Sequence, residues 1–316
     1  MANPETAAPV ALDVRDVHYA YGRHKAVSGV SFSVKPGEVF GLLGPNGAGK
    51  TTTLGMIAGL LPPLAGEVLV FDQPLSSRSA RRRLGVVPQE VALYEELTVR
   101  ENVAFWARLN GLRGKTLDEA VARALDRVGL TDRASSRVST LSGGLKRRTN
   151  LAAGLAHGPD LLLLDEPTVG IDPQARLAII EVVREEARAG RGVLYTSHYL
   201  EEAEDLCDRI AIVDAGRVLA LGTVPELRRL VGEGPTIAIR GRVVPDDVQP
   251  LVARVSGVQL IGAPDGAVAL AAQDEASCSG FVRELFGSGL RIDDIRIREP
   301  NLQSLFLKLT GRELRD

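Results

Sequence analysis

Residues 44–51 of this chain are Gly44-Pro45-Asn46-Gly47-Ala48-Gly49-Lys50-Thr51. A glycine, four residues, then glycine, lysine and a hydroxyl residue is the pattern of a phosphate-binding loop. The apolar run 39–43 before it predicts a strand, and residues 52–60 are expected to continue as a helix. Loop amides and the positive end of the helix dipole then form a concave site for nucleotide oxygens. A plain glycine-rich turn is the alternative, but both flanks favour the phosphate-binding interpretation.

Side chains of this loop, which we call the phosphate loop, have distinct expected roles. Its glycines let the backbone approach a phosphate without a side-chain clash. Lys50 supplies a mobile positive charge for the terminal phosphates. The hydroxyl of Thr51 is placed to ligate the Mg²⁺ that bridges them.

Composition narrows the class of protein. The chain has 316 residues, enough for one large domain and a small one. Charged residues make up 25% and balance to a net charge of -2, so there is no global basic field for nucleic acid. Cys207 and Cys278 are too few for a disulfide framework, which suits a reducing compartment, and both are expected to be apolar packing residues.

Membrane spans and signal sequences are not expected. No apolar run approaches the roughly 18 to 20 residues that a membrane span needs. Residues 1–10 lack a basic stretch followed by an apolar one, and they are expected to form a loose lead-in. A soluble or peripheral protein is therefore predicted.

The first part of the chain predicts an antiparallel layer followed by a helical insert. Alternating strands are expected over residues 12–34, broken at the turn beside Tyr21. There the Tyr21 ring can stack on a base, although an ordinary half-buried sheet tyrosine is the simpler interpretation. A hairpin-like segment at 66–71 and a strand ending at Gln89 follow. Helical spacing then predicts an insert of about residues 90–157, with helices at 99–109, 117–128 and 145–156.

Residues 141–145 open the last of these helices with Leu-Ser-Gly-Gly-Leu. The hydroxyl of Ser142 and the amides of Gly143 and Gly144 at a helix N-terminus form a second anion-binding arrangement. Taken alone this signal is weak, because an ordinary N-cap followed by flexible glycines has the same sequence.

Two carboxylates follow the apolar run 161–164, which predicts a buried central strand. Ligands of open α/β sheets gather at the carboxyl ends of such strands. Asp165 can hold Mg²⁺ through water, and Glu166 can polarise an attacking water as a general base. Neighbouring strand residues point to opposite sides, which favours separate roles. Solvated acids at a strand end are the alternative, and the phosphate loop disfavours it.

A second buried strand is expected at 193–197, after a helix at 173–189. His198 ends this strand at the ligand edge, where it can donate to a terminal phosphate and help to hold the glutamate. A structural role is the alternative for a lone histidine. A hairpin at 210–220 and a short helix at 225–230 are expected to close the domain.

The pattern restarts after Gly232-Glu233-Gly234-Pro235. The expected order of elements is βαββαβ with a final helix, which predicts a ferredoxin-like α+β domain over residues 236–316. The strands are expected at 237–239, 258–261, 268–271 and 292–297, and the helices at 246–255, 275–286 and 302–309. The segment has no recognisable catalytic cluster, so a regulatory or dimer-supporting role is expected.

Taken together, residues 11–232 resemble the nucleotide-binding subunits of ATP-binding cassette (ABC) transporters. The implied fold is an α/β P-loop NTPase domain with a RecA-like core, an antiparallel β layer and an α-helical insert. The resemblance implies a set of nucleotide-binding residues from four motifs. They are the Walker A residues Gly44, Asn46, Gly47, Gly49, Lys50, Thr51 and Thr52, the aromatic Tyr21, the signature residues Ser142, Gly143 and Gly144, and the D-loop residue Asp172. The implied catalytic residues are Glu166, His198, Lys50 and the Q-loop residue Gln89, and the implied Mg²⁺ residues are Thr51, Gln89 and Asp165.

Within that family the chain is similar to the ATPases of ABC-2 type exporters, the group that contains daunorubicin-type drug and antibiotic exporters. The similarity is carried by Leu145-Lys146-Arg147-Arg148 and by a tail from Glu299-Pro300-Asn301-Leu302 through residues 306–307 to Thr310-Gly311-Arg312-Glu313-Leu314. Leu145 departs from the glutamine of most members. Because Ser142 and Gly144 are expected to make the phosphate contacts, activity is expected to survive.

The resemblance also implies a dimeric mechanism. Two chains, either copies or paralogues, would sandwich two ATP molecules, each between one phosphate loop and the other chain's Ser142. Nucleotide state then becomes dimer state. Gln89 would sense Mg²⁺ and the attacking water and couple the insert to a separate transmembrane permease. The implied location is cytoplasmic, peripheral on the inner face of the cell membrane, and the cargo is open among drug, antibiotic, lipid and polysaccharide.

Two alternatives stay open. An importer ATPase shares every motif, although such subunits often carry a β-barrel tail. A soluble cassette ATPase acting on ribosomes or nucleic acid usually has two cassettes or a long coiled coil, and the sequence shows one cassette and no sustained heptads. The basic clusters 81–83 and 146–148 are expected to be solvated or subunit-facing patches, so no nucleic-acid partner is expected.

Overall fold

The computed structural model describes residues 10–231, 234–262, 267–299 and 301–310. The chain divides into two compact units, with the boundary between Val224 and Pro225. The expected lead-in at residues 1–9, the turn residues Gly232 and Glu233, and the tail residues Pro300 and 311–316 lie outside the described residues.

A six-stranded sheet forms the centre of the first unit, in the order β10-β9-β3-β8-β7-β6. Within this sheet, β3, β6, β7, β8 and β9 pair in parallel, and only β10 pairs antiparallel, with β9. The strands are β3 (Val39–Leu43), β6 (Leu84–Val87), β7 (Leu161–Asp165), β8 (Gly192–Ser197), β9 (Arg209–Asp214) and β10 (Arg217–Thr223). Every residue of β3 and β7 is buried, as parallel strands covered on both faces require.

A second, antiparallel sheet has the order β2-β1-β4-β5 and confirms the expected layer. It comprises β1 (Leu12–Tyr21), β2 (His24–Val34), β4 (Ala65–Val70) and β5 (Gln73–Pro74). The two sheets share one hydrophobic core. Within it the rings of Phe32 and Phe40 stack with centroids 4.9 Å apart, so the layer is fixed directly to the strand that precedes the phosphate loop.

Further helices lie along the chain between strands of the first unit. They are α1 (Lys50–Ile57), α2 (Arg78–Arg82), α6 (Pro173–Arg188) and α7 (Leu200–Leu206). The sequence analysis did not predict the short helices α2 and α7. A signal for α7 was present, because Leu200, Ala203 and Leu206 recur every third residue and are all buried.

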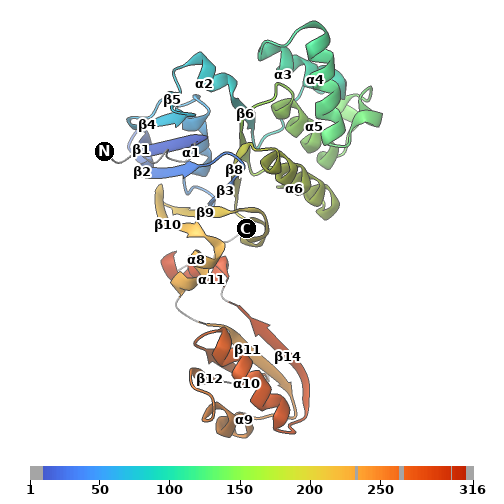
Figure 1. Cartoon of the computed structure of the whole chain (residues 1–316). Coiled ribbons are helices and arrows are strands. Elements are labelled where there is room, and N and C mark those ends of the chain that lie inside the picture. The colour runs from blue at the N-terminus through green and yellow to red at the C-terminus, as the bar shows by residue number, and fades with distance from the viewer. Residues whose placement is uncertain (1–9, 232–233, 263–266, 300, 311–316) are drawn as a thin grey trace, which may run out of the picture. The chain divides into compact units, whose positions relative to one another are not determined.

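The expected helical insert is formed by α3 (Val99–Leu109), α4 (Gly114–Arg127) and α5 (Gly143–Leu155), drawn together in green in Figure 1. Thr98 begins α3 with a capping box, because its hydroxyl accepts from the Glu101 amide and the Glu101 carboxylate accepts from the Thr98 amide. The insert therefore starts at a position that the local sequence fixes.

The second unit contains a four-stranded antiparallel sheet in the order β12-β13-β11-β14. Its strands are β11 (Thr236–Gly241), β12 (Val258–Gly262), β13 (Val268–Ala272) and β14 (Ile292–Arg298), and its helices are α8 (Val224–Val231), α9 (Pro245–Val252), α10 (Glu275–Gly287) and α11 (Leu302–Thr310). Read from the other edge, the order is fourth, first, third and second strand, which confirms the ferredoxin-like expectation.

Helix α8 belongs to the second unit, whereas the sequence analysis assigned it to the end of the first. Two polar contacts explain the difference. Arg228 pairs with Glu299 at 3.2 Å, and the Lys308 ammonium donates to the Leu230 carbonyl at 3.3 Å. These contacts are long-range, so the local pattern of α8 does not reveal them.

Both cysteines are buried and unpaired, as expected of packing residues. Burial raises the pKa of the Cys207 and Cys278 thiols, which keeps both neutral. Across the described ranges, no helix combines the length and apolar character that crossing a membrane requires.

Replacing Phe281 tests whether the core of the second unit is independent of the core of the first. Phe281 is fully buried in the cluster formed by the sheet and α10 of this unit. Replacing it with alanine is expected to lower the free energy of unfolding of this unit by about 3–5 kcal/mol. Hydrogen exchange should show faster opening of β11 and β13 amides and unchanged exchange in β3 and β7.

The matched control is Phe286→Ala, because Phe286 lies on the same helix with 70% of its surface exposed. This change should alter stability by less than about 0.5 kcal/mol. Equal effects of the two substitutions would contradict the assignment of Phe281 to a core.

Candidate functional site

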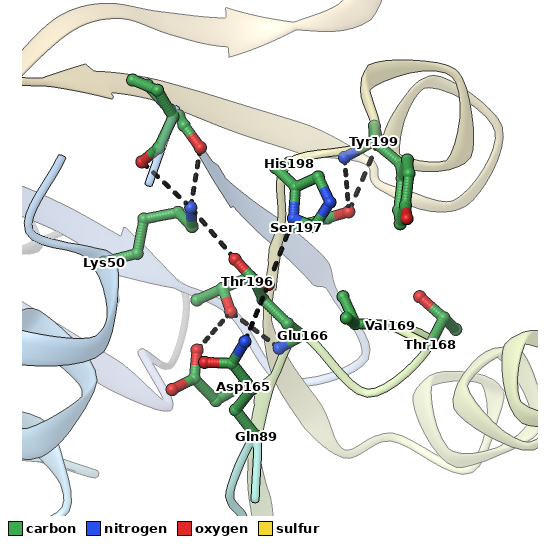
Figure 2. A network of polar contacts seen from close by, with 12 residues as sticks. Lys50, Gln89, Asp165, Glu166, Thr168, Val169, Thr196, Ser197, His198 and Tyr199 are labelled. Atoms are coloured by element: carbon green, nitrogen blue, oxygen red, sulfur yellow. Dashed lines mark hydrogen bonds and ion pairs between the residues drawn. The ribbon is translucent and has the colours of Figure 1, made fainter. Parts of the chain in front are cut away.

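Three loops meet at the carboxyl edge of the central sheet (Figure 2). The phosphate loop follows β3, Glu166 follows β7, and His198 follows β8. Because β8 lies between β3 and β7 and all three are parallel, their carboxyl ends lie side by side. Strand order therefore brings together residues that are far apart in the sequence.

The backbone of the phosphate loop depends on its glycines. Gly47 and Gly49 have φ angles of 83° and 100°, which favour glycine. A Cβ at Gly44 would lie 2.2 Å from the Val213 carbonyl oxygen, and one at Gly49 would lie 2.5 Å from the Ala26 carbonyl oxygen. Gly49 is also the N-cap of α1, so the first amides of that helix have no side-chain cap. This cradle of uncapped amides fits a phosphate group.

Lys50 is held at three points. Its ammonium donates to the carbonyls of Gly44 at 2.7 Å and Pro45 at 3.2 Å, and lies 3.1 Å from Glu166 Oε1. The side chains of Lys50 and Glu166 are only 4% and 5% exposed. The cation is thus buried, with its charge balanced by the carboxylate from the neighbouring loop.

The carboxylate of Glu166 is the meeting point of the expected catalytic residues. Oε1 pairs with Lys50, while Oε2 accepts from Gln89 Nε2 at 3.3 Å and lies 3.1 Å from His198 Nδ1 (Figure 2). Its φ angle is 44°, a left-handed conformation that is costly for a residue with a side chain. Such a conformation persists where surrounding contacts hold it.

Asp165 has different partners from its neighbour. The hydroxyl of Thr196 donates to Asp165 Oδ1 at 2.7 Å and accepts from the amide of Glu166 at 2.9 Å. One buried hydroxyl therefore fixes both acidic residues. The sequence analysis missed Thr196, although a hydroxyl in an otherwise apolar strand requires a hydrogen-bond partner.

The expected Mg²⁺ residues offer oxygen donors of three kinds, from Thr51, Gln89 and Asp165. Among the residues described, no group of three or more histidine, cysteine or acidic side chains is arranged to hold a metal. A nucleotide-bound Mg²⁺ needs no such cluster, since phosphates and waters complete its octahedron. The hydroxyl, amide and carboxylate set therefore fits this ion.

A cavity of about 350 Å³ extends from the phosphate loop to Glu166. It is lined by Tyr21, His24, Ala26, Pro45, Asn46, Gly47, Gly49, Lys50, Thr51, Thr52, Gln89 and Glu166. Tyr21 is 52% exposed at this cavity, and its ring forms a T-shaped pair with Tyr19, with centroids 5.0 Å apart. Tyr21 is thus an exposed aromatic side chain at a cavity of the size that small ligands use.

Ser142 and Asp172 lie elsewhere. They line a separate hollow of about 230 Å³ with Gly144, and no residue of the phosphate loop lines it. Ser142 is the N-cap of α5, and Asp172 is the N-cap of α6, with Oδ1 accepting from the Ala175 amide at 2.9 Å. A Cβ at Gly144 would lie 2.7 Å from the Ala175 Cβ, so this glycine also permits close packing of α5 on α6.

The basic cluster 146–148 is not a uniform solvated or subunit-facing patch, and that expectation was wrong for Arg147. This residue is 7% exposed, and its guanidinium donates to the carbonyls of Pro88, Gln89 and Val169. Burial lowers the pKa of Arg147, and the charges of the two acidic residues oppose that effect. Arg147 is internal because α5 packs between the core and the other insert helices, which local sequence does not show.

Known proteins resemble this chain over most of its length. Residues 27–169 match the family model described as ABC transporter. The chain is 41% identical to the linearmycin resistance ATP-binding protein LnrL of Bacillus subtilis (strain 168), over 96% of this chain and 100% of that protein. It is 39% identical to the Nod factor export ATP-binding protein I of Cupriavidus metallidurans, over 96% and 99%.

Solved structures resemble it over a shorter length. A structure described as the ATP-binding subunit of an ABC transporter has a TM-score of 0.65 at 34% identity, covering 70% of this chain and 93% of that one. CbiO1 from Clostridium perfringens, described as part of the ABC transporter complex cbiONQ, has a TM-score of 0.63 at 29% identity, covering 71% and 95%.

Thr196→Val tests the hydroxyl that joins the two acidic residues. The substitution keeps the shape but leaves the buried Glu166 amide without its acceptor. We expect the free energy of unfolding to fall by about 1–3 kcal/mol, measured by urea denaturation. Thr196→Ser is the control, because it keeps the hydroxyl and should retain more of the stability. A valine variant as stable as the original chain would show that this hydrogen bond is not needed.

Proposed function

The chain belongs to the ABC transporter family and is an ATPase of it, and on this premise we propose that it energises an export permease. Its fold is that of the P-loop ABC nucleotide-binding domain, as the sequence analysis expected. We propose residues 11–232 as the functional cassette and residues 236–316 as an accessory domain, with helix α8 of the first range belonging to the second compact unit. The observation that carries the proposed mechanism is the contact of Glu166 with Lys50, Gln89 and His198.

We propose that Glu166 is the general base of ATP hydrolysis. One of its carboxylate oxygens pairs with Lys50. The triphosphate of ATP carries more charge than one carboxylate and competes for the lysine. Transfer of Lys50 to the phosphates frees Glu166 to accept a proton from the attacking water. His198 keeps hold of the other oxygen and so fixes the direction of the carboxylate.

Thr51, Gln89 and Asp165 are the residues that we propose to hold Mg²⁺. When bound, the ion neutralises charge on the β- and γ-phosphates. The phosphate loop binds the same phosphates through its amides, and Tyr21 stacks on the adenine. Thr196 orients Asp165 toward this role, because its hydroxyl donates to the carboxylate.

A head-to-tail pair of cassettes is the proposed active unit. Within one chain, Ser142 and Asp172 line a hollow that contains none of the phosphate-loop residues. A second chain, either a copy or a paralogue, supplies its own Ser142 to the γ-phosphate. ATP then acts as the bridge between chains, and hydrolysis removes that bridge.

Export is favoured over import by the printed names of two relatives, which concern resistance and Nod factor export. We therefore propose the ABC-2 type exporter group, with the chain peripheral at the cytoplasmic face of the membrane through its permease. The motifs and the site do not distinguish the importer alternative. A soluble ATPase acting on ribosomes or nucleic acid is the remaining alternative, and co-purification separates it.

An apolar cavity is the proposed docking place for the permease. It has a volume of about 370 Å³ and is lined by residues of α2, β6, α3 and α5 and by neighbouring segments, including the one that follows α1. Leu60 and Val86 line it and are 76% and 39% exposed. Exposed apolar side chains around a hollow are typical of partner sites. Pro88 also lines this cavity, and the next residue along the chain is Gln89, so a partner bound here would lie beside a residue of the proposed site.

Glu166→Gln tests the general base. The amide cannot accept the proton, so steady-state ATP hydrolysis should fall at least about 100-fold, measured by phosphate release. ATP binding, measured by calorimetry, should persist. Glu185→Gln, an exposed change on α6, should hydrolyse ATP at the original rate. Undiminished hydrolysis in the Glu166 variant would remove this residue from its proposed role.

Co-purification tests the partner and the cavity together. The Glu166→Gln chain, held with ATP and Mg²⁺, should recover one multi-span protein in matching amount from gently solubilised membranes of its own source. Adding Leu60→Asp should reduce recovery about tenfold, since a buried charge opposes apolar docking. Leu219→Asp is the control, because Leu219 lies on β10 at the opposite edge of the sheet from β6. Recovery only with ribosomes or nucleic acid would overturn the exporter proposal.

A further inference from the structure

Glu202 is a buried acid that the proposed mechanism does not use. It lies on α7, and its side chain is 3% exposed. Oε1 accepts from the Tyr195 hydroxyl at 2.6 Å, the Thr168 hydroxyl at 2.9 Å and the Ser197 hydroxyl at 3.4 Å. A buried carboxylate is tolerated only where such donors compensate for its lost hydration.

The second oxygen of Glu202 has a looser environment. Oε2 lies 3.6 Å from Arg176 Nε, and neither atom has a hydrogen-bond partner within the described part of the chain. The Arg176 guanidinium lies over the Tyr199 ring, 4.7 Å from its centroid. The charge of Glu202 is therefore balanced by a nearby cation on α6, while its hydrogen bonds all go to hydroxyl groups.

These contacts join the two segments that carry the catalytic pair. Thr168 lies two residues after Glu166 in the loop of residues 166–172, which we call the post-strand loop. Ser197 and Tyr199 flank His198 in residues 197–199, which we call the switch segment (Figure 2). Glu202 accepts from Thr168 in the first and from Ser197 in the second. Helix α7, which directly follows the switch segment, therefore holds the post-strand loop through the Glu202 carboxylate.

The strained backbone at Glu166 explains why such a tether is needed. Its left-handed conformation, with φ of 44°, requires contacts on both sides of the residue. On the amino side, Thr196 accepts from the Glu166 amide. On the carboxyl side, the Thr168 hydroxyl is held by Glu202. Burial, with the negative charge of Glu202, raises the pKa of Tyr195 well above its usual value, so its hydroxyl stays a donor to the same oxygen.

We propose that Glu202 is a positioning residue of the ATPase site. It holds the post-strand loop against the switch segment, so that the Glu166 carboxylate stays in reach of His198 and of the attacking water. The inference rests on the proposed role of Glu166 as general base. Because Arg176 lies in the first turn of α6 and Asp172 is the N-cap of that helix, the tether also links the switch segment to the proposed dimer-facing end of α6.

Glu202→Gln is the principal test, with Glu201→Gln as its matched control. Glu201 is the preceding residue of α7 and is exposed. We expect kcat for ATP hydrolysis to fall about tenfold in the Glu202 variant, since small displacements of reacting groups have large kinetic effects. The KM for ATP should change less than about twofold, because the phosphate loop is untouched. The Glu201 variant should match the original chain.

Thr168→Val supplies a second variant that removes one donor and leaves Glu202 in place. It should also lower kcat about tenfold, and combining it with Glu202→Gln should add little, because both break the same tether. In the Glu166→Gln background, neither change should lower the residual single-turnover rate further. A residue acting through Glu166 has no effect once that carboxylate is gone.

Three results would count against the inference. They are a Glu202→Gln variant with the original kcat, losses from Thr168→Val and Glu202→Gln that multiply independently, and losses from either change that persist in the Glu166→Gln background. Persistence there is what a general loss of structure predicts. If the original chain itself hydrolyses no ATP, the proposed function fails first. An active original chain with an equally active Glu202 variant removes this inference alone.

Discussion

The buried ion pair between Lys50 and Glu166 joins the phosphate loop to the end of β7 across the intervening strand β8. Removing two charges from water is costly, and such a pair is weak evidence for stability. Hydrogen bonds offset part of this lost hydration. The carbonyls of Gly44 and Pro45 accept from the lysine, and Gln89 and His198 contact the carboxylate. A pair that is expensive to bury and easily reorganised by a triphosphate suits a site that must respond to nucleotide.

Strand β8 contacts different acidic residues with the side chains on its two faces. Successive side chains of a strand point to opposite faces. Thr196 and His198 contact the acidic residues at the end of β7, while Tyr195 and Ser197 contact Glu202. The strand thereby places one hydroxyl against the Asp165 carboxylate and the Glu166 amide, and two more against the Glu202 carboxylate. The geometry of the site follows from the period of two and from the position of β8 between β3 and β7.

The helical insert contacts the loops of the site through the buried guanidinium of Arg147. Arg147 donates from α5 to the carbonyls beside Gln89 and to Val169 in the post-strand loop. The insert is therefore hydrogen-bonded to two loops of the site through one side chain. The second unit has a hydrophobic core of its own.

The sequence by itself determined the phosphate loop, the buried strands with acids at their ends, the helical insert and the ferredoxin-like order of the second unit. These features are local, because a glycine spacing or an apolar period fixes backbone conformation within a few residues. Only the tertiary structure decided that Arg147 is internal, that the Thr196 hydroxyl bonds to both acidic residues at the end of β7, and that Glu202 accepts from Thr168 and Ser197. The partners of Arg147 at Gln89 and of Glu202 at Thr168 are 58 and 34 residues away in the sequence. Burial of a polar side chain depends on which distant groups satisfy it, and packing alone supplies those groups.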